Sequence, residues 1–142
     1  MSLVLKPIPP SSKALSIGLL DLAAELKLRW GHLLESSGYR LAVRRDVASQ
    51  FRNRGRKHCD FLLIGGRDPA GMLQAIINIR EHLGWAVPIL CVVERASNTL
   101  VEHALDVGAD DCVTWPCSDA LFLARVNALI RRTARYDSPG PS

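Results

Sequence analysis

The sequence predicts an α/β domain in which helices cover both faces of a parallel β-sheet. Short apolar runs alternate with helical patterns along the chain, and most of these runs lack the apolar–polar alternation of a half-exposed strand. Continuous apolar runs are typical of strands that are buried on both faces, as in parallel sheets. The chain has 142 residues, of which 48% are hydrophobic and 23% charged, so one domain with a substantial core is expected and a disordered chain is excluded.

Five strands and five helices are expected, in alternation. The strands cover residues 14–20, 39–43, 59–64, 87–93 and 111–115, and the helices cover 22–37, 47–54, 72–82, 99–106 and 119–134. Gly38 and Gly108 suit helix C-termini, and Ser118 suits the N-cap of the last helix. Right-handed crossovers between successive strands favour a flavodoxin-like sheet with the strand order 2-1-3-4-5.

The two ends of the chain differ in composition from this core. Residues 1–12 include three prolines and are expected to form a flexible tail, residues 13–134 the folded domain, and residues 135–142 a linker toward a possible further domain. No apolar run reaches the roughly 20 residues of a membrane span, and there is no signal peptide pattern. The four cysteines lack metal-binding spacing, so we expect a cytoplasmic protein without metal or cofactor.

A basic run lies between Arg44 and Lys57, where six Lys or Arg residues accompany the single acid Asp46. A solvated helix face followed by a loop accounts for such a run. Contact with an acidic partner or a nucleic acid is the alternative. The net charge of +4 does not by itself indicate nucleic-acid binding.

The C-terminal third carries the most specific pattern. It contains "VPILCVV" at 87–93, "GADD" at 108–111, a proline after the fifth strand and "LARVNALIRR" at 123–132. Together these segments resemble the receiver domains of bacterial two-component response regulators, in particular the winged-helix subfamily. The resemblance covers about residues 14–132. It implies a receiver-like fold and a role in signal transduction.

The resemblance also implies a site, and that site departs from the family pattern. A working receiver has a phosphoacceptor aspartate after strand three, two acids that hold Mg²⁺, and a hydroxyl and a lysine that bind the phosphoryl oxygens. The corresponding positions here are Asp21, Leu22, Gly65, Val93 and Trp115, followed by the one retained residue, Pro116. The aromatic residue that follows the family's switch is replaced by Cys112. We therefore expect a degenerate pocket and a pseudo-receiver that is not an enzyme.

Two further expectations concern this pocket. Asp68, three residues beyond Gly65, is the only credible substitute acceptor. In receivers the proline after the lysine commonly follows a cis peptide bond, and we expect the same at Pro116. Trp115 would then cover the ends of the strands and fill the volume left by Gly65.

The resemblance finally implies a surface for self-association, formed by the fourth expected helix, the fifth strand and the last helix. Its candidate residues are His103, Asp110, Asp111, Leu121, Arg125 and Arg132. The leading hypothesis is a homodimer, or contact with a signalling partner, that controls an attached output domain. Transcription regulation is the favoured output. Nucleic acid would be bound only through such an attached domain. The alternatives are ordinary solvated charges on this face and a small-ligand sensor that uses the vacated pocket near Gly65 and Trp115.

Overall fold

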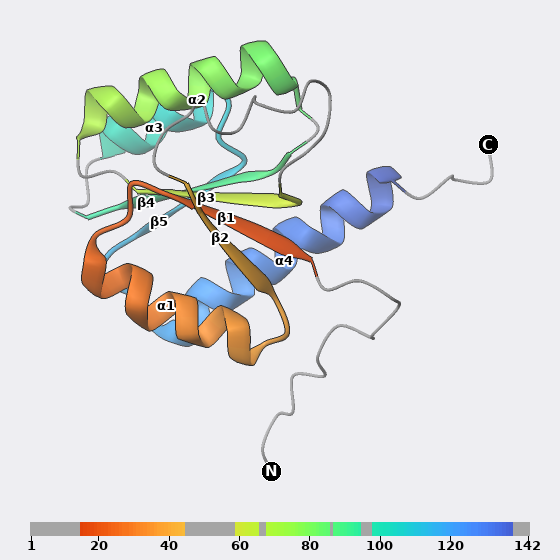
Figure 1. The fold of residues 1–142 in the computed structure, drawn as a ribbon. Coiled ribbons are helices and arrows are strands. Elements are labelled where there is room, and N and C mark those ends of the chain that lie inside the picture. The colour runs from red at the N-terminus through yellow and green to blue at the C-terminus, as the bar shows by residue number, and fades with distance from the viewer. Residues whose placement is uncertain (1–14, 45–58, 66–67, 86, 95–97, 138–142) are drawn as a thin grey trace.

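The computed structural model describes residues 15–44, 59–65, 68–85, 87–94 and 98–137, which form one parallel five-stranded sheet with the order β2-β1-β3-β4-β5. Its strands are β1 (Ser16–Leu20), β2 (Arg40–Arg44), β3 (Phe61–Gly65), β4 (Ile89–Val93) and β5 (Asp111–Thr114) (Figure 1). The predicted fold class and strand order are confirmed.

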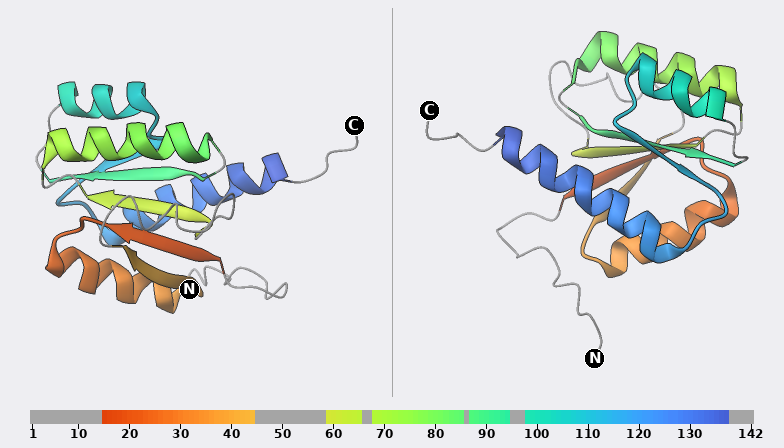
Figure 2. Two further views of the ribbon diagram at one scale, coloured as in Figure 1. Left: turned by 45° about the horizontal axis from the view of Figure 1, so that its top comes forward. Right: turned by 180° about the vertical axis from the view of Figure 1, so that it is seen from behind.

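Four helices are described: α1 (Ala24–Ser36), α2 (Pro69–Leu83), α3 (Asn98–Val107) and α4 (Asp119–Asp137). Helices α1 and α4 cover one face of the sheet, and α2 and α3 cover the other (Figures 1 and 2). None of these helices is long and apolar enough to cross a membrane. The predicted helix at 47–54 lies outside the described residues, as do most of the basic run and the predicted tail at 1–12.

Two helices are longer than the sequence predicted. Helix α2 begins three residues earlier than expected, at Pro69, because proline is tolerated in a first turn where its missing N–H would have no helical partner. Helix α4 continues to Asp137, three residues beyond the expected end at 134, so the first three residues of the predicted linker are helical. Residues at helix ends such as these do not continue the apolar pattern by which the helix was predicted.

The core consists of two clusters, one on each face of the sheet. Alternate strand residues such as Leu19, Phe61 and Leu63 are fully or almost fully buried on the side of α1 and α4. Their neighbours, such as Leu62 and Ile64, are buried on the side of α2 and α3. Each such side chain contributes about 1.5–3 kcal/mol on burial. Burial on both faces explains the continuous apolar runs of the sequence.

The predicted helix signals are confirmed. Gly38 follows α1 with φ +97°, and Gly108 follows α3 with φ +130°, a backbone conformation that glycine adopts without strain. The N–H of Leu121 donates to Oγ of Ser118 at 3.0 Å, so Ser118 caps α4.

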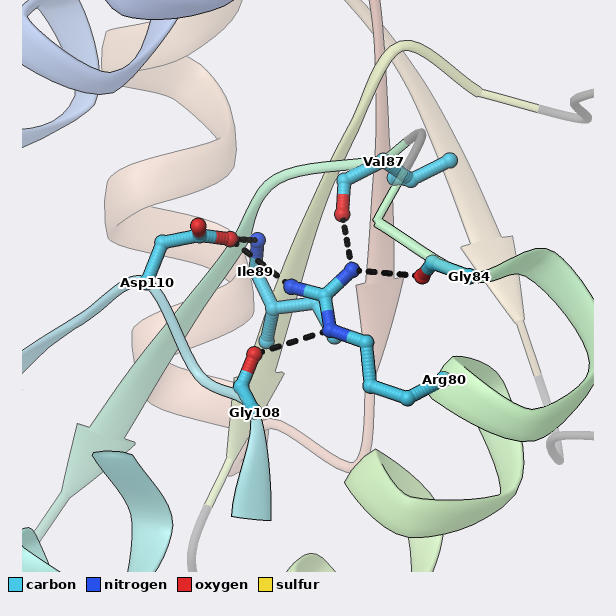
Figure 3. Close-up of polar contacts among 6 residues, drawn as sticks. All are labelled: Arg80, Gly84, Val87, Ile89, Gly108 and Asp110. Carbon is cyan, nitrogen blue, oxygen red and sulfur yellow. Dashed lines mark hydrogen bonds and ion pairs between the residues drawn. The ribbon is translucent and has the colours of Figure 1, made fainter. Parts of the chain in front are cut away.

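The side chain of Arg80 in α2 holds together the segments at the amino ends of β4 and β5, which we call the amino edge of the sheet (Figure 3). Its Nε donates to the carbonyl oxygen of Gly108 at 2.8 Å, and one terminal nitrogen donates to the carbonyl oxygens of Gly84 at 3.0 Å and Val87 at 2.7 Å. The side chain is only 8% exposed. One guanidinium therefore joins the end of α2, the segment before β4 and the segment before β5.

Asp110 completes this network from the other side. Its Oδ2 accepts a hydrogen bond from the second terminal nitrogen of Arg80 at 2.8 Å and another from the backbone N–H of Ile89 at 2.7 Å. Burial lowers the pKa of Arg80, and the Asp110 carboxylate counteracts this effect. The indole of the exposed Trp85 lies 4.3 Å from the guanidinium carbon and covers it from outside.

Replacing Arg80 should strongly destabilise the domain. We expect Arg80→Ala to lower the free energy of unfolding by about 3 kcal/mol, because it leaves three carbonyls without this donor and the Asp110 carboxylate without its positive partner in a largely buried place. Arg80→Lys should restore little, because an ammonium cannot reproduce the planar fork. Urea unfolding followed by circular dichroism measures both.

The matched control is Arg125→Ala, which breaks an exposed pair with Asp111. This change should cost less than about 1 kcal/mol. Equal losses for the two alanine variants would show that the Arg80 network is not a special source of stability.

Candidate functional site at the carboxyl edge of the sheet

The predicted pocket positions lie at one edge of the sheet, because parallel strands bring their carboxyl ends together. Asp21 and Leu22 directly follow β1, Gly65 is the last residue of β3, and Val93 is the last residue of β4. Trp115 directly follows β5, and its N–H donates to the carbonyl oxygen of Val93 at 2.7 Å. The topology therefore assembles the positions that the resemblance implies.

Gly65 lies against the backbone of the loop after β1. A Cβ at this position would overlap the carbonyl oxygen of Asp21 and would lie 3.0 Å from Cα of Leu22. Asp21 itself has a φ of +55°, a left-handed conformation that is uncommon for a residue with a side chain. The loop thus occupies the place where a side chain on the last residue of β3 would begin.

This contact bears on two expectations. Gly65 is explained by the backbone of Asp21 and Leu22, which lies where a Cβ of residue 65 would begin, so the predicted match between the glycine and the Trp115 indole gains no support from this contact. The same loop occupies part of the space at Gly65 that the small-ligand hypothesis invoked.

Trp115 instead packs toward α1 and α4. Its ring meets that of Trp30 edge to face, with centroids 5.3 Å apart, and Trp30 stacks on Phe122 at 4.0 Å. Trp30 and Phe122 are both fully buried, whereas Trp115 is half-buried. The three rings connect the end of β5 to both helices of this face. The peptide bond between Trp115 and Pro116 is cis, as predicted.

Arg29 covers the outer side of this aromatic cluster. Its guanidinium carbon lies 5.5 Å from the centroid of the Trp115 ring, and its Nε lies 3.1 Å from Oδ1 of Asp119. The sequence reasoning missed Arg29, Trp30 and Phe122, because each belongs to a helix pattern that a buried or solvated face explains equally well.

Among the described pocket positions, Asp21 supplies the one carboxylate. Asp21 and Asp68 are both exposed, and Asp68 occupies the N-cap position of α2. Among the described residues there is no group of three His, Cys, Asp or Glu side chains placed to hold a metal ion. The buried Nε1 of Trp30 has no hydrogen-bond partner. In the described part of the chain, it is the only buried side-chain nitrogen or oxygen without one.

The candidate association face has mixed character. Asp110 is occupied within its own chain by Arg80 and Ile89, so it contributes less to this face than the sequence suggested. Asp111 pairs with Arg125 at 3.2 Å. Leu121 remains 44% exposed on α4, and on α3 Leu105, which the prediction did not include, is 42% exposed. His103 and Arg132 are exposed.

Comparison with known proteins adds sequence relatives and structural neighbours, although no family model matches the chain. The sensory transduction protein RegX3 of Mycolicibacterium smegmatis is 32% identical over 108 residues, which is 76% of this chain and 47% of RegX3. The phosphate regulon transcriptional regulatory protein PhoB of Pseudomonas aeruginosa is 36% identical over 62 residues, 44% of this chain and 27% of PhoB. The chain thus spans less than half the length of these relatives.

A solved structure has the same fold, and the match includes most of this chain and nearly all of the other chain. The CheY-like response regulator receiver domain protein of Methanospirillum hungatei superposes with a TM-score of 0.74 at 14% identity, and the match covers 87% of this chain and 99% of that chain. The chain has the fold of a response regulator receiver domain. In this receiver fold the carboxyl edge just described is the place of the site that the resemblance implied.

The closed arrangement at Gly65 can be tested by adding a methyl group. We expect Gly65→Ala to destabilise the domain by about 1–3 kcal/mol, because the loop after β1 must move to admit the Cβ. Asp21→Gly should have the opposite sign and stabilise by up to about 1 kcal/mol, because glycine adopts the left-handed backbone without strain. Thermal unfolding measures both. A neutral Gly65→Ala would mean that the loop does not close on β3.

Proposed function

We propose that this receiver-fold domain acts in two-component signalling by protein–protein contact, without phosphorylation of an aspartate. The observation that carries the proposal is the end of β3, where the last residue is Gly65 and the backbone of Asp21 lies against it. Glycine offers no nucleophile for a phosphoryl group. The nearby loop leaves no room for a longer side chain without rearrangement.

The neighbouring residues support the same conclusion. Val93 has no hydrogen-bonding side chain, and the Trp115 indole has a single N–H donor, so neither replaces a hydroxyl or an ammonium at a phosphoryl oxygen. Asp21 next to the buried, apolar Leu22 is a poor site for Mg²⁺, which prefers several oxygen ligands. The domain is accordingly proposed to be neither an enzyme nor a phosphoryl acceptor.

Control of an attached output domain is the proposed consequence of this contact. The relatives RegX3 and PhoB are named as a sensory transduction protein and a transcriptional regulatory protein, and both are longer than the matched region. Transcription control through a further domain is therefore the favoured output, and any contact with nucleic acid would be made by that domain.

The proposed contact surface is the face of α3, β5 and α4, and the proposed partner is a second copy of the chain. The exposed Leu105 and Leu121 supply apolar surface on the two helices. Asp111 and Arg125 supply a charged pair that is still half-open to solvent and so can exchange partners across an interface. His103 and Arg132 would lie at its rim.

Acetyl phosphate with Mg²⁺ tests the absence of phosphorylation. We expect the mass of the intact protein to remain unchanged after incubation, and we expect no one-to-one Mg²⁺ binding in calorimetry. A phosphorylation-competent receiver treated in parallel controls for the reagent. A base-labile phosphoryl group on Asp21 or Asp68 would overturn the proposal.

Sedimentation velocity tests the proposed dimer. The wild-type chain should associate at micromolar concentration through an interface of about 1,200–2,000 Å² in total. Leu121→Glu should shift the population to monomer, because it places a charge at the apolar part of the interface, and Arg125→Glu should do the same by removing the complementary charge. Leu28→Glu on α1, where Leu28 is 78% exposed, is the matched control and should remain dimeric. A monomeric wild type would contradict the proposed surface.

A further inference from the structure

Two cysteines from different strands lie side by side in the sheet. Cys91 of β4 and Cys112 of β5 are register partners in the parallel pair. Both pack into the cluster beneath α2 and α3, so their side chains lie on the same face. The Cys91 side chain is fully buried, whereas Cys112 is partly exposed on β5, an edge strand of the sheet.

The two thiols interact with each other. The hydrogen bond between them lowers the pKa of Cys112, against the opposing effects of burial and of the Asp111 carboxylate. The same hydrogen bond, together with burial, raises the pKa of Cys91 well above its usual value. Cys112 is therefore the better nucleophile and the less buried of the two residues, and Cys91 is a protonated thiol held next to it.

We propose that Cys91 and Cys112 form a redox modification site at which a hydroperoxide converts the adjacent thiols into a reversible disulfide between β4 and β5. The site does not depend on the proposed phosphorylation-independent signalling, because neither cysteine belongs to the pocket around Gly65. It adds a chemical input at β5, the strand that connects α3 to α4.

The chemistry has two steps. The Cys112 thiolate attacks one oxygen of the hydroperoxide, the O–O bond breaks, and Cys112 becomes a sulfenic acid while the other oxygen leaves as water or alcohol after taking a proton. Cys91 then attacks this sulfur, the S–O bond breaks, and hydroxide leaves as water with the proton of the Cys91 thiol. With hydrogen peroxide, two thiols and one peroxide give one disulfide and two water molecules.

The spacing of β4 and β5 allows a disulfide between Cys91 and Cys112, but this disulfide would be strained. Neighbouring strands lie about 4.8 Å apart, which is within the Cα separation that disulfides span but above their usual Cβ separation of about 3.8 Å. The strands must therefore approach slightly when the bond forms. Strained disulfides are more easily reduced, which suits a reversible modification rather than a permanent structural cross-link.

The experiment is oxidation of the reduced 142-residue chain with a small excess of hydrogen peroxide, followed by alkylation and peptide mapping. We expect a mass loss of two hydrogen atoms and a peptide pair linked through Cys91 and Cys112, both reversed by dithiothreitol. Cys91→Ser should stop at a sulfenic acid on Cys112 that dimedone traps. Cys112→Ser should lose both products.

The other two cysteines provide matched controls. Cys59→Ser and Cys117→Ser should keep the Cys91–Cys112 link, and circular dichroism of every reduced variant identifies any that fails to fold. Oxidation of the wild type only at Cys117, or only between two chains, would overturn the proposal. So would a wild-type chain whose Cys91 and Cys112 remain reduced while a small-molecule thiol in the same tube is consumed.

Discussion

Burial of both faces of the parallel sheet is the constraint on which the rest of this structure depends. A parallel strand must be followed by a crossover, and helices α1, α2, α3 and α4 provide the cover that keeps the apolar strands away from water. Because all strands then run in one direction, every loop after a strand meets at the same edge. The position of the candidate site follows from this constraint before any chemistry is considered.

The two edges of the sheet are stabilised by different interactions. At the amino edge, the Arg80 guanidinium donates to three backbone carbonyls and to the Asp110 carboxylate, so these acceptors in two connections are paired. At the carboxyl edge, stacked and edge-to-face aromatic rings take the place of a polar network. These rings join the end of β5 to α1 and α4, and the exposed carboxylates of Asp21 and Asp68 remain at the same edge.

The pocket at the carboxyl edge and the Cys91–Cys112 pair would support two different kinds of regulation. Phosphoryl chemistry would need an acceptor and Mg²⁺ ligands at the carboxyl edge, where the described pocket positions after β3, β4 and β5 hold Gly65, Val93 and Trp115. The proposed thiol chemistry needs an oxidant and two sulfurs at register positions within the sheet, and β4 and β5 supply the two sulfurs. The strand that joins α3 to α4 would thus receive its signal through the side chain of Cys112, in the middle of β5.

The sequence alone determined the fold class, the strand order, the helix caps at Gly38, Gly108 and Ser118, and the cis bond before Pro116. The strands and caps depend on local patterns, namely apolar runs and backbone conformations that favour glycine, whereas the cis bond was expected from the resemblance to receiver domains. The identities of the pocket positions were also legible, because strand ends can be counted along the chain. Only the tertiary structure decided what those residues touch. Gly65 is set by the backbone of a loop more than forty residues earlier, Trp115 by rings on two separate helices, and Arg80 by carbonyls from two other connections. Contacts of this kind depend on packing between distant segments, and packing leaves no periodic signal in the sequence of either partner.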